Sequence, residues 1–221
     1  MNLHQNQELA ELKDKLLAMA SRVETAITKG IRALVERDDD LASKVKIEDD
    51  EIDELEIEID DMAVALLAKA PLARDLRFII VAMKICQNLE RAGDEAAGVA
   101  KQAIRLNREE QLKPYVDIPR MADMALDMLH RSLDAFVTGN ATVAREVLPM
   151  DLEVDDLHKQ LQRELVSYML ESPSTITRCL ALLQLAKRLE RIADHATNIA
   201  EEVVYLLEGR DIRHGNKGLD T

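Results

Sequence analysis

The chain has 221 residues, enough for one elongated domain or for two lobes of about 100 residues each. It is 47% hydrophobic and 32% charged but only 2% aromatic, with 7 Gly and 5 Pro, a composition that favours long helices and predicts an all-α protein. The formal net charge is −13, and this excess of acid, with so few aromatic side chains, argues against a nucleic-acid partner.

Apolar residues recur at spacings of three and four along almost the whole chain, as in amphipathic helices. Polar or turn-forming segments interrupt the pattern, so that six helices are predicted, with breaks at 37–40, 70–73, 107–120, 138–141 and 171–174. The start of the chain lacks the apolar stretch of a signal peptide, and the longest apolar run is far shorter than the ~20 residues of a membrane span. We therefore expect a soluble, cytoplasmic protein.

The two cysteines, Cys86 and Cys179, lie far apart within apolar helical patterns and show no metal-ligand spacing. We expect them to be reduced core residues.

The second half of the sequence repeats the first. EIDEL at 51–55 matches EVDDL at 153–157, and LERAGDEAAGVA at 89–100 matches LERIADHATNIA at 189–200. Matching residues are 102 positions apart in the first pair of segments and 100 apart in the second. The two-residue difference in length must therefore lie in the turn between the helices that carry these segments. The repeat predicts two tandem three-helix bundles followed by a flexible tail, with boundaries at 1–107, 108–208 and 209–221.

Paired carboxylates stand at equivalent positions in the two halves. The run 47–61 holds ten carboxylates and no Lys or Arg. Residues four apart lie on one face of a helix, and this spacing recurs in the following helix and in the second half. The pairs are Asp49 with Asp53, Glu90 with Asp94, Asp151 with Asp155, and Glu190 with Asp194.

The positions of these pairs bring them together in each half. Asp53 lies as far before the predicted turn near Leu72 as Glu90 lies after it, to within a residue, so an antiparallel hairpin places both at one height. At about 100° per residue, both pairs lie on the same side of the apolar stripes. In the second half, the predicted turn lies near Pro173, and Asp155 and Glu190 lie at matching distances before and after it. Each lobe is therefore predicted to gather four carboxylates along one groove.

Four neighbouring anions would repel each other or take up protons unless a cation lies among them. Oxygen ligands suit hard ions, so Mg²⁺, Ca²⁺, Mn²⁺ or iron are the expected metals. The Glu-x-x-His pattern of buried di-iron bundles is missing, because Gly93 and Ala193 occupy the required positions. His158 and Glu201 either extend the second metal site or are ordinary surface residues.

Three other polar side chains lie beside the predicted grooves. His195 is expected to point away from the groove, towards solvent or another helix. Arg91 and Arg191 neighbour the glutamates and can neutralise nearby acids as simple ion pairs.

The sequence contains no nucleophile elbow, phosphate loop or Ser, His and Asp grouping, so we expect no enzyme. Two alternatives stay open on the residues alone. One is a metal-dependent phosphohydrolase that uses a carboxylate-bound cluster. The other is a metal store or a purely structural bundle, whose acids form solvated faces.

The repeated motifs give the chain a resemblance to a known family. LERIADHATNIAEEVVYL at 189–206, its weaker copy at 89–104, the upstream acidic pairs and the tandem layout resemble PhoU, the regulator of the bacterial phosphate-specific transport system. The likeness extends from about residue 8 to 207. The first copy departs from the pattern of the second at Gly98 and Lys101, where the second has Asn198 and Glu201.

The resemblance implies a cytoplasmic, dimer-forming regulator that represses the phosphate-starvation response when phosphate is plentiful. It implies peripheral membrane association through two partners, the ATPase of the phosphate ABC transporter and a sensor histidine kinase. It also implies metal clusters on the acidic motifs, which map to Asp49, Asp53, Glu90 and Asp94 in one lobe and Asp151, Asp155, Glu190 and Asp194 in the other.

Overall fold

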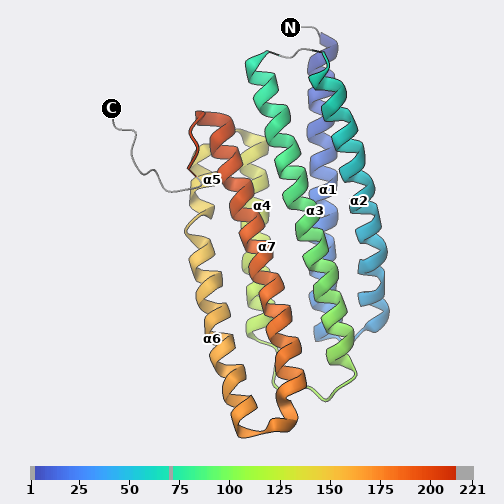
Figure 1. The fold of residues 1–221 in the computed structure, drawn as a ribbon, viewed down its shortest axis with the longest axis vertical. Coiled ribbons are helices and arrows are strands. Elements are labelled where there is room, and N and C mark those ends of the chain that lie inside the picture. The colour runs from blue at the N-terminus through green and yellow to red at the C-terminus, as the bar shows by residue number, and fades with distance from the viewer. Residues whose placement is uncertain (1–2, 70–71, 213–221) are drawn as a thin grey trace, which may run out of the picture.

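The computed structural model describes residues 3–69 and 72–212, and the helices in these ranges form two three-helix bundles side by side (Figure 1). The first bundle consists of α1 (Leu3–Val35), α2 (Asp39–Leu67) and α3 (Ala73–Asn107). The second consists of α4 (Asp117–Thr138), α5 (Ala141–Val147), α6 (Met150–Glu171) and α7 (Ile176–Glu208). The predicted all-α fold and its tandem bundles are confirmed.

The helix boundaries follow local chemistry. Asp38 caps α2 by accepting a hydrogen bond from the backbone N–H of Leu41, and Asn140 caps α5 in the same way. Gly139 and Gly209 end α4 and α7 in the left-handed conformation, at φ of 66° and 70°. Each predicted interruption in the described ranges spans a junction between two helices, but its edges overlap them: α4 already begins at Asp117, within the predicted break at 107–120.

The fifth predicted helix differs from the expectation in one detail. It begins with the separate short helix α5, and α6 follows after Leu148 and Pro149. Proline has no backbone N–H and its ring clashes with the preceding helical turn, so the helix cannot continue through position 149. A 3₁₀ turn, Pro173–Thr175, then leads into α7.

The core is aliphatic and continuous across both bundles. Cys86 and Cys179 are buried and unpaired within it, as predicted. Its main aromatic contact joins the lobes, because Phe78 of α3 stacks on Phe136 of α4 with ring centroids 5.6 Å apart. Burial of this apolar surface provides the main driving force for folding.

Helices α3 and α7 lie antiparallel at the centre of the molecule, with α2 and α6 on the outer sides and α1 and α4 behind (Figure 1). The His195 ring nitrogen Nδ1 lies 3.1 Å from the Asn88 side-chain oxygen, and Arg188 donates to Glu95 over 2.8 Å. In the repeat register, each of these contacts is the copy of the other. A pseudo-twofold axis therefore passes between α3 and α7 and relates the two lobes.

The tail after α7 is non-helical from Gly209 to Ile212, and Ile212 packs against the core. The rest of the predicted flexible tail lies outside the described residues. No helix in the described ranges combines the length and the hydrophobicity that a membrane span requires.

Candidate cation site

The first lobe brings its four predicted carboxylates into one electrostatic neighbourhood. Asp49 and Asp53 project from α2, and Glu90 and Asp94 project from α3. Burial and the neighbouring charge of Asp94 raise the pKa of Asp49 to about 6 and that of Glu90 to about 7. The same two causes raise the pKa of Asp53. The two acidic pairs of this hairpin therefore act on one another electrostatically, and their role as metal ligands stays a prediction.

A glycine allows the two helices of this hairpin to approach closely. A Cβ atom on Gly93 would lie 3.1 Å from Ile52 Cδ1 and 3.6 Å from Asp49 Oδ1. The absence of a side chain at position 93 thus lets α2 and its carboxylates pack directly against α3.

The second lobe repeats the arrangement. Burial and the charge of Glu190 raise the pKa of Asp194 to about 6. Burial and the charge of Asp155 raise the pKa of Asp151. One carboxylate oxygen of Asp151, Oδ1, is buried with no hydrogen-bond partner among the residues that the structure describes, which is costly for a charged group.

The second cluster contains two lysines that the first lacks. Lys187 pairs with Glu190, and Lys159 lies 3.4 Å from Asp155. The repeat register places Gln87 and Ile57 at the equivalent positions of the first lobe. Sequence reasoning missed these lysines, although their spacings of three and four from the acids were available as a signal. The first cluster therefore carries the less compensated negative charge.

The carboxylates suit a hard cation by chemistry and by mutual charge. In the described part of the chain, however, no three His, Cys, Asp or Glu side chains converge tightly enough to ligate one ion as they stand. Binding a metal therefore requires rotation of side chains at the groove surface. Asp49, Asp53, Glu90 and Asp94 would hold it in the first lobe, and Asp151, Asp155, Glu190 and Asp194 in the second.

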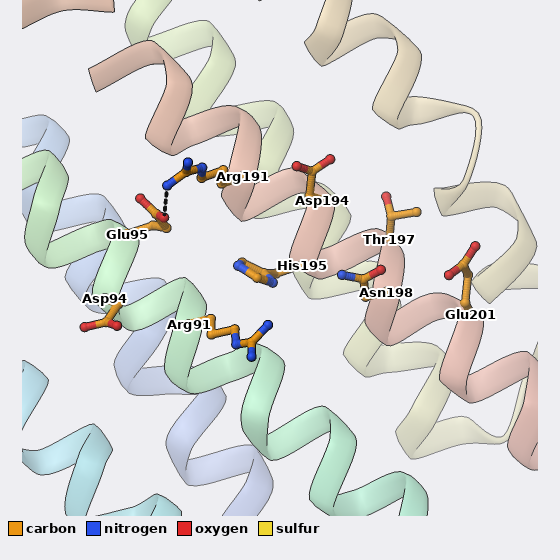
Figure 2. Close-up of a pocket in the computed structure, with 9 residues that line it drawn as sticks. All are labelled: Arg91, Asp94, Glu95, Arg191, Asp194, His195, Thr197, Asn198 and Glu201. Carbon is orange, nitrogen blue, oxygen red and sulfur yellow. Dashed lines mark hydrogen bonds and ion pairs between the residues drawn. The ribbon is translucent and has the colours of Figure 1, made fainter. Parts of the chain in front are cut away.

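A cavity of about 570 Å³ lies between α3 and α7, at the pseudo-twofold axis (Figure 2). Asp94 and Asp194 stand on its two sides and point away from each other, each towards the outer helix of its own lobe (Figure 2). Arg191 donates to Glu95 over 3.0 Å, the simple ion pair expected for it. The two carboxylate clusters thus border one shared central hollow.

His195 was predicted to face either solvent or another helix, and it faces another helix, α3. Its ring contacts Asn88 and lies between Arg91 and Arg191 in the central cavity (Figure 2). Burial, followed by the charge of Arg91, lowers the pKa of His195. Glu201 also lines the cavity, whereas His158 is half-buried on α6 and is not among the residues that line it.

The departure at Gly98 has a structural cause. A Cβ atom at this position would lie 2.1 Å from Nη1 of Arg188, which pairs with Glu95. On the other side of the pseudo-twofold axis, the equivalent of Arg188 is the shorter Asn88, and the equivalent of Gly98 is the larger Asn198. The Asn198 side chain donates to the Asn88 side chain over 3.3 Å. The pair Arg188 and Gly98 on one side of the axis and the pair Asn88 and Asn198 on the other therefore fill similar volumes.

The fold and this site define a class: a duplicated all-α bundle in which two helices of each repeat carry paired acidic residues. The sequence model described as the PhoU domain matches residues 16–103 and again 118–203. The chain belongs to the PhoU family.

Named relatives and solved structures agree. The chain is 42% identical to the "Phosphate-specific transport system accessory protein PhoU homolog" of Pseudomonas putida, over 95% of this chain and 82% of the relative. The homologue from Pseudomonas aeruginosa is also 42% identical, with coverage of 95% and 87%.

The crystal structure of PhoU from Pseudomonas aeruginosa superposes with a TM-score of 0.90 at 41% identity, covering 93% of this chain and 99% of that one. The crystal structure of the phosphate transport system regulatory protein PhoU from Streptococcus pneumoniae gives 0.88 at 31% identity, with coverage of 94% and 99%.

Proposed function

We propose that this chain is a regulatory adaptor of phosphate homeostasis. In this role it acts in the cytoplasm as a homodimer, restrains uptake through the phosphate ABC transporter and keeps the phosphate-starvation response repressed. It contacts the transporter ATPase and the sensor histidine kinase, and reaches the membrane only through them. Family membership and the regulatory names of the relatives support the proposal.

The observation that carries the molecular part of the proposal is the mutual charge of the two carboxylate clusters. Asp94 acts electrostatically on the three other acids of its cluster, and Glu190 acts on two of its own. A divalent cation or iron in each groove would relieve this repulsion and stiffen the contact between the paired helices. The adaptor needs no catalytic residue for this role.

Elemental analysis of purified protein tests the cation sites. We expect bound metal in the wild type, partial loss when the first-lobe acids are replaced by Asn or Gln, and near-complete loss when all eight are replaced. A control variant, in which four exposed acids outside the two clusters are replaced by Asn or Gln, should keep its metal. Suitable positions are Asp40, Glu109, Asp123 and Glu146. Wild-type protein that retains no metal would contradict cation binding.

Pull-downs with the transporter ATPase and the sensor kinase test the adaptor role separately. A reporter of the phosphate-starvation response, measured in a deletion strain complemented with this chain, tests repression. Metal-dependent phosphatase turnover that disappears in Asp155→Asn would instead favour a phosphohydrolase. Sedimentation velocity tests the homodimer.

A further inference from the structure

Each lobe exposes a group of large apolar side chains at the tip of its acidic hairpin. The first tip patch consists of Val64, Leu72, Leu76 and Ile80, exposed by 39–66%. The second tip patch consists of Val166, Leu170, Ile176 and Leu180, exposed by 40–81%. Three members of each patch are repeat equivalents of members of the other. Clustered exposed apolar residues on a folded protein mark interaction surfaces more often than single ones do.

The tip patches lie on the same side of the helices as the carboxylates. Leu76 precedes Asp94 by 18 residues, which is about five turns and returns to the same face. Val64 follows Asp53 by 11 residues, about 20° from the same line. This face of each hairpin therefore changes from an anionic cluster to an apolar end over roughly 20 Å.

The pseudo-twofold axis sets the two grooves in opposite directions. The hairpin tip of α2 and α3 lies at one end of the molecule, and that of α6 and α7 lies at the other (Figure 1). Leu76 and Ile176 each stand about 15 residues from the level of the α3–α7 crossing. The two patches are therefore roughly 45 Å apart along the helices.

We propose that the face formed by α2, α3, α7 and α6, which carries both carboxylate clusters and both tip patches, docks a twofold-symmetric protein partner. The partner binds through two equivalent helices, each apolar at one end and rich in Lys or Arg at the other. Each partner helix spans about four turns, with its apolar end on a tip patch and its basic end at a carboxylate cluster. The inference rests on the proposed adaptor function.

Charge complementarity favours this occupant over a second copy of the chain. Face-to-face packing of two copies about a twofold axis would bring acidic grooves near acidic grooves in a chain of net charge −13. Like charges across an interface are costly, whereas basic groups steer association and fix register. The proposed homodimer would therefore use another surface.

Competition with cations follows from the same contacts. The basic ends of the partner helices and divalent cations neutralise the same carboxylates. Each must therefore weaken the binding of the other, by the same factor in both directions.

The test measures affinity for two probes: the ATPase subunit of the phosphate transporter and the full-length sensor kinase in lipid nanodiscs. One variant carries Val64→Gln with Leu72→Gln, and its counterpart carries Val166→Gln with Leu170→Gln. The control carries Ile47→Gln with Val116→Gln, at positions exposed by 64% and 66% outside the patches.

We expect each patch variant to weaken binding of at least one probe by a similar factor, about tenfold or more, and the fourfold variant to abolish it, because two linked contacts reinforce each other. The control should bind like the wild type. Binding should be tighter in chelator than with added Mg²⁺ or Mn²⁺, and weaker in high salt.

Several results would overturn the inference. They are wild-type affinity in both patch variants, loss confined to one lobe, or binding that requires a divalent cation. A change in the sedimentation of the isolated chain on altering the patches would assign the face to a second copy instead. If the wild type binds a probe and the patch variants bind equally well, the adaptor function survives alone; if it binds neither, both proposals fail.

Discussion

At the scale of single residues, folding raises the pKa of several carboxylates in the two clusters. A raised pKa means that the folded protein holds a proton more tightly than the unfolded chain does. For an acid, this favours the folded state at low pH, and the benefit disappears as the pH rises through the folded pKa. For Asp49, Glu90 and Asp194 this range is about pH 4 to 7.

We therefore expect the urea concentration at the unfolding midpoint, measured in the presence of a chelator, to decrease as the pH is raised from 5 to 8. The paired change Asp49→Asn with Glu90→Gln should raise stability at pH 8, by on the order of 1 kcal/mol after allowing for solvent screening, and flatten the pH dependence. Added divalent cation should do the same for the wild type. A midpoint that rises with pH in chelator would contradict this account.

Arg37 is a second residue whose backbone is informative. It has a φ of 57°, in the left-handed region, and its Nη2 donates to the carbonyl oxygens of Asn107 and Glu109, both at 2.6 Å. The repeat equivalent in the second lobe is Gly139, also left-handed. The arginine accepts an unfavourable conformation and ties the end of α1 to the connection between the lobes.

We expect Arg37→Ala to destabilise the protein by about 2 kcal/mol, and Arg37→Gly by about 1 kcal/mol less. Both changes remove the hydrogen bonds, so the difference between them isolates the backbone strain. Urea denaturation of the two variants measures it. Equal stability of the two would show that position 37 carries no strain.

At the scale of elements, the contact between α3 and α7 is held by few but well-placed polar groups. The Glu95 side chain is only 12% exposed and accepts from Arg188 and Arg191 over 2.8 and 3.0 Å. Small residues such as Ala96 and Ala196 are buried on the same helices. One carboxylate thus joins two cations of the opposite lobe.

Glu95→Gln should cost about 1–2 kcal/mol in the free energy of unfolding, because a neutral amide leaves two guanidinium groups poorly compensated. Glu146→Gln, at an exposed position, should change it by less than about 0.5 kcal/mol. A double-mutant cycle with Arg188→Gln measures the coupling directly. Additive effects in that cycle would rule out the pair as a contact between lobes.

At the scale of the whole molecule, the two lobes share a core rather than a loose hinge. The stacked Phe78 and Phe136 join α3 to α4, and Lys84 lies 3.0 Å from Glu202 across α3 and α7. The Glu95 ion pairs add to this interface.

We expect a single cooperative unfolding transition, with coincident curves from circular dichroism and calorimetry. Phe136→Ala should lower its midpoint without splitting it, since a buried aromatic side chain costs ~3 kcal/mol or more to remove. Two separate transitions would show that the lobes fold independently.

Most of the fold was predictable from the sequence because helical periodicity and an internal repeat are local signals. Spacings of three and four define a buried stripe on any helix, whatever it packs against. The positions of the acidic pairs on neighbouring helices were predictable for the same reason, whereas their role as a cation site stays a prediction. The short α5 was missed because one proline ends a helix without disturbing the apolar spacing.

The sequence by itself determined the helices, their duplication and the placement of an acidic pair on each helix of the two hairpins, since all of these depend on periodicity and short connections. Only the tertiary structure decided how the two lobes meet: Asn88 against His195, Arg188 over Gly98, and the central cavity between them. These contacts join residues about 100 positions apart, and their geometry depends on how two finished surfaces pack together. No local pattern records that packing, because many faces of a helix are compatible with one sequence spacing.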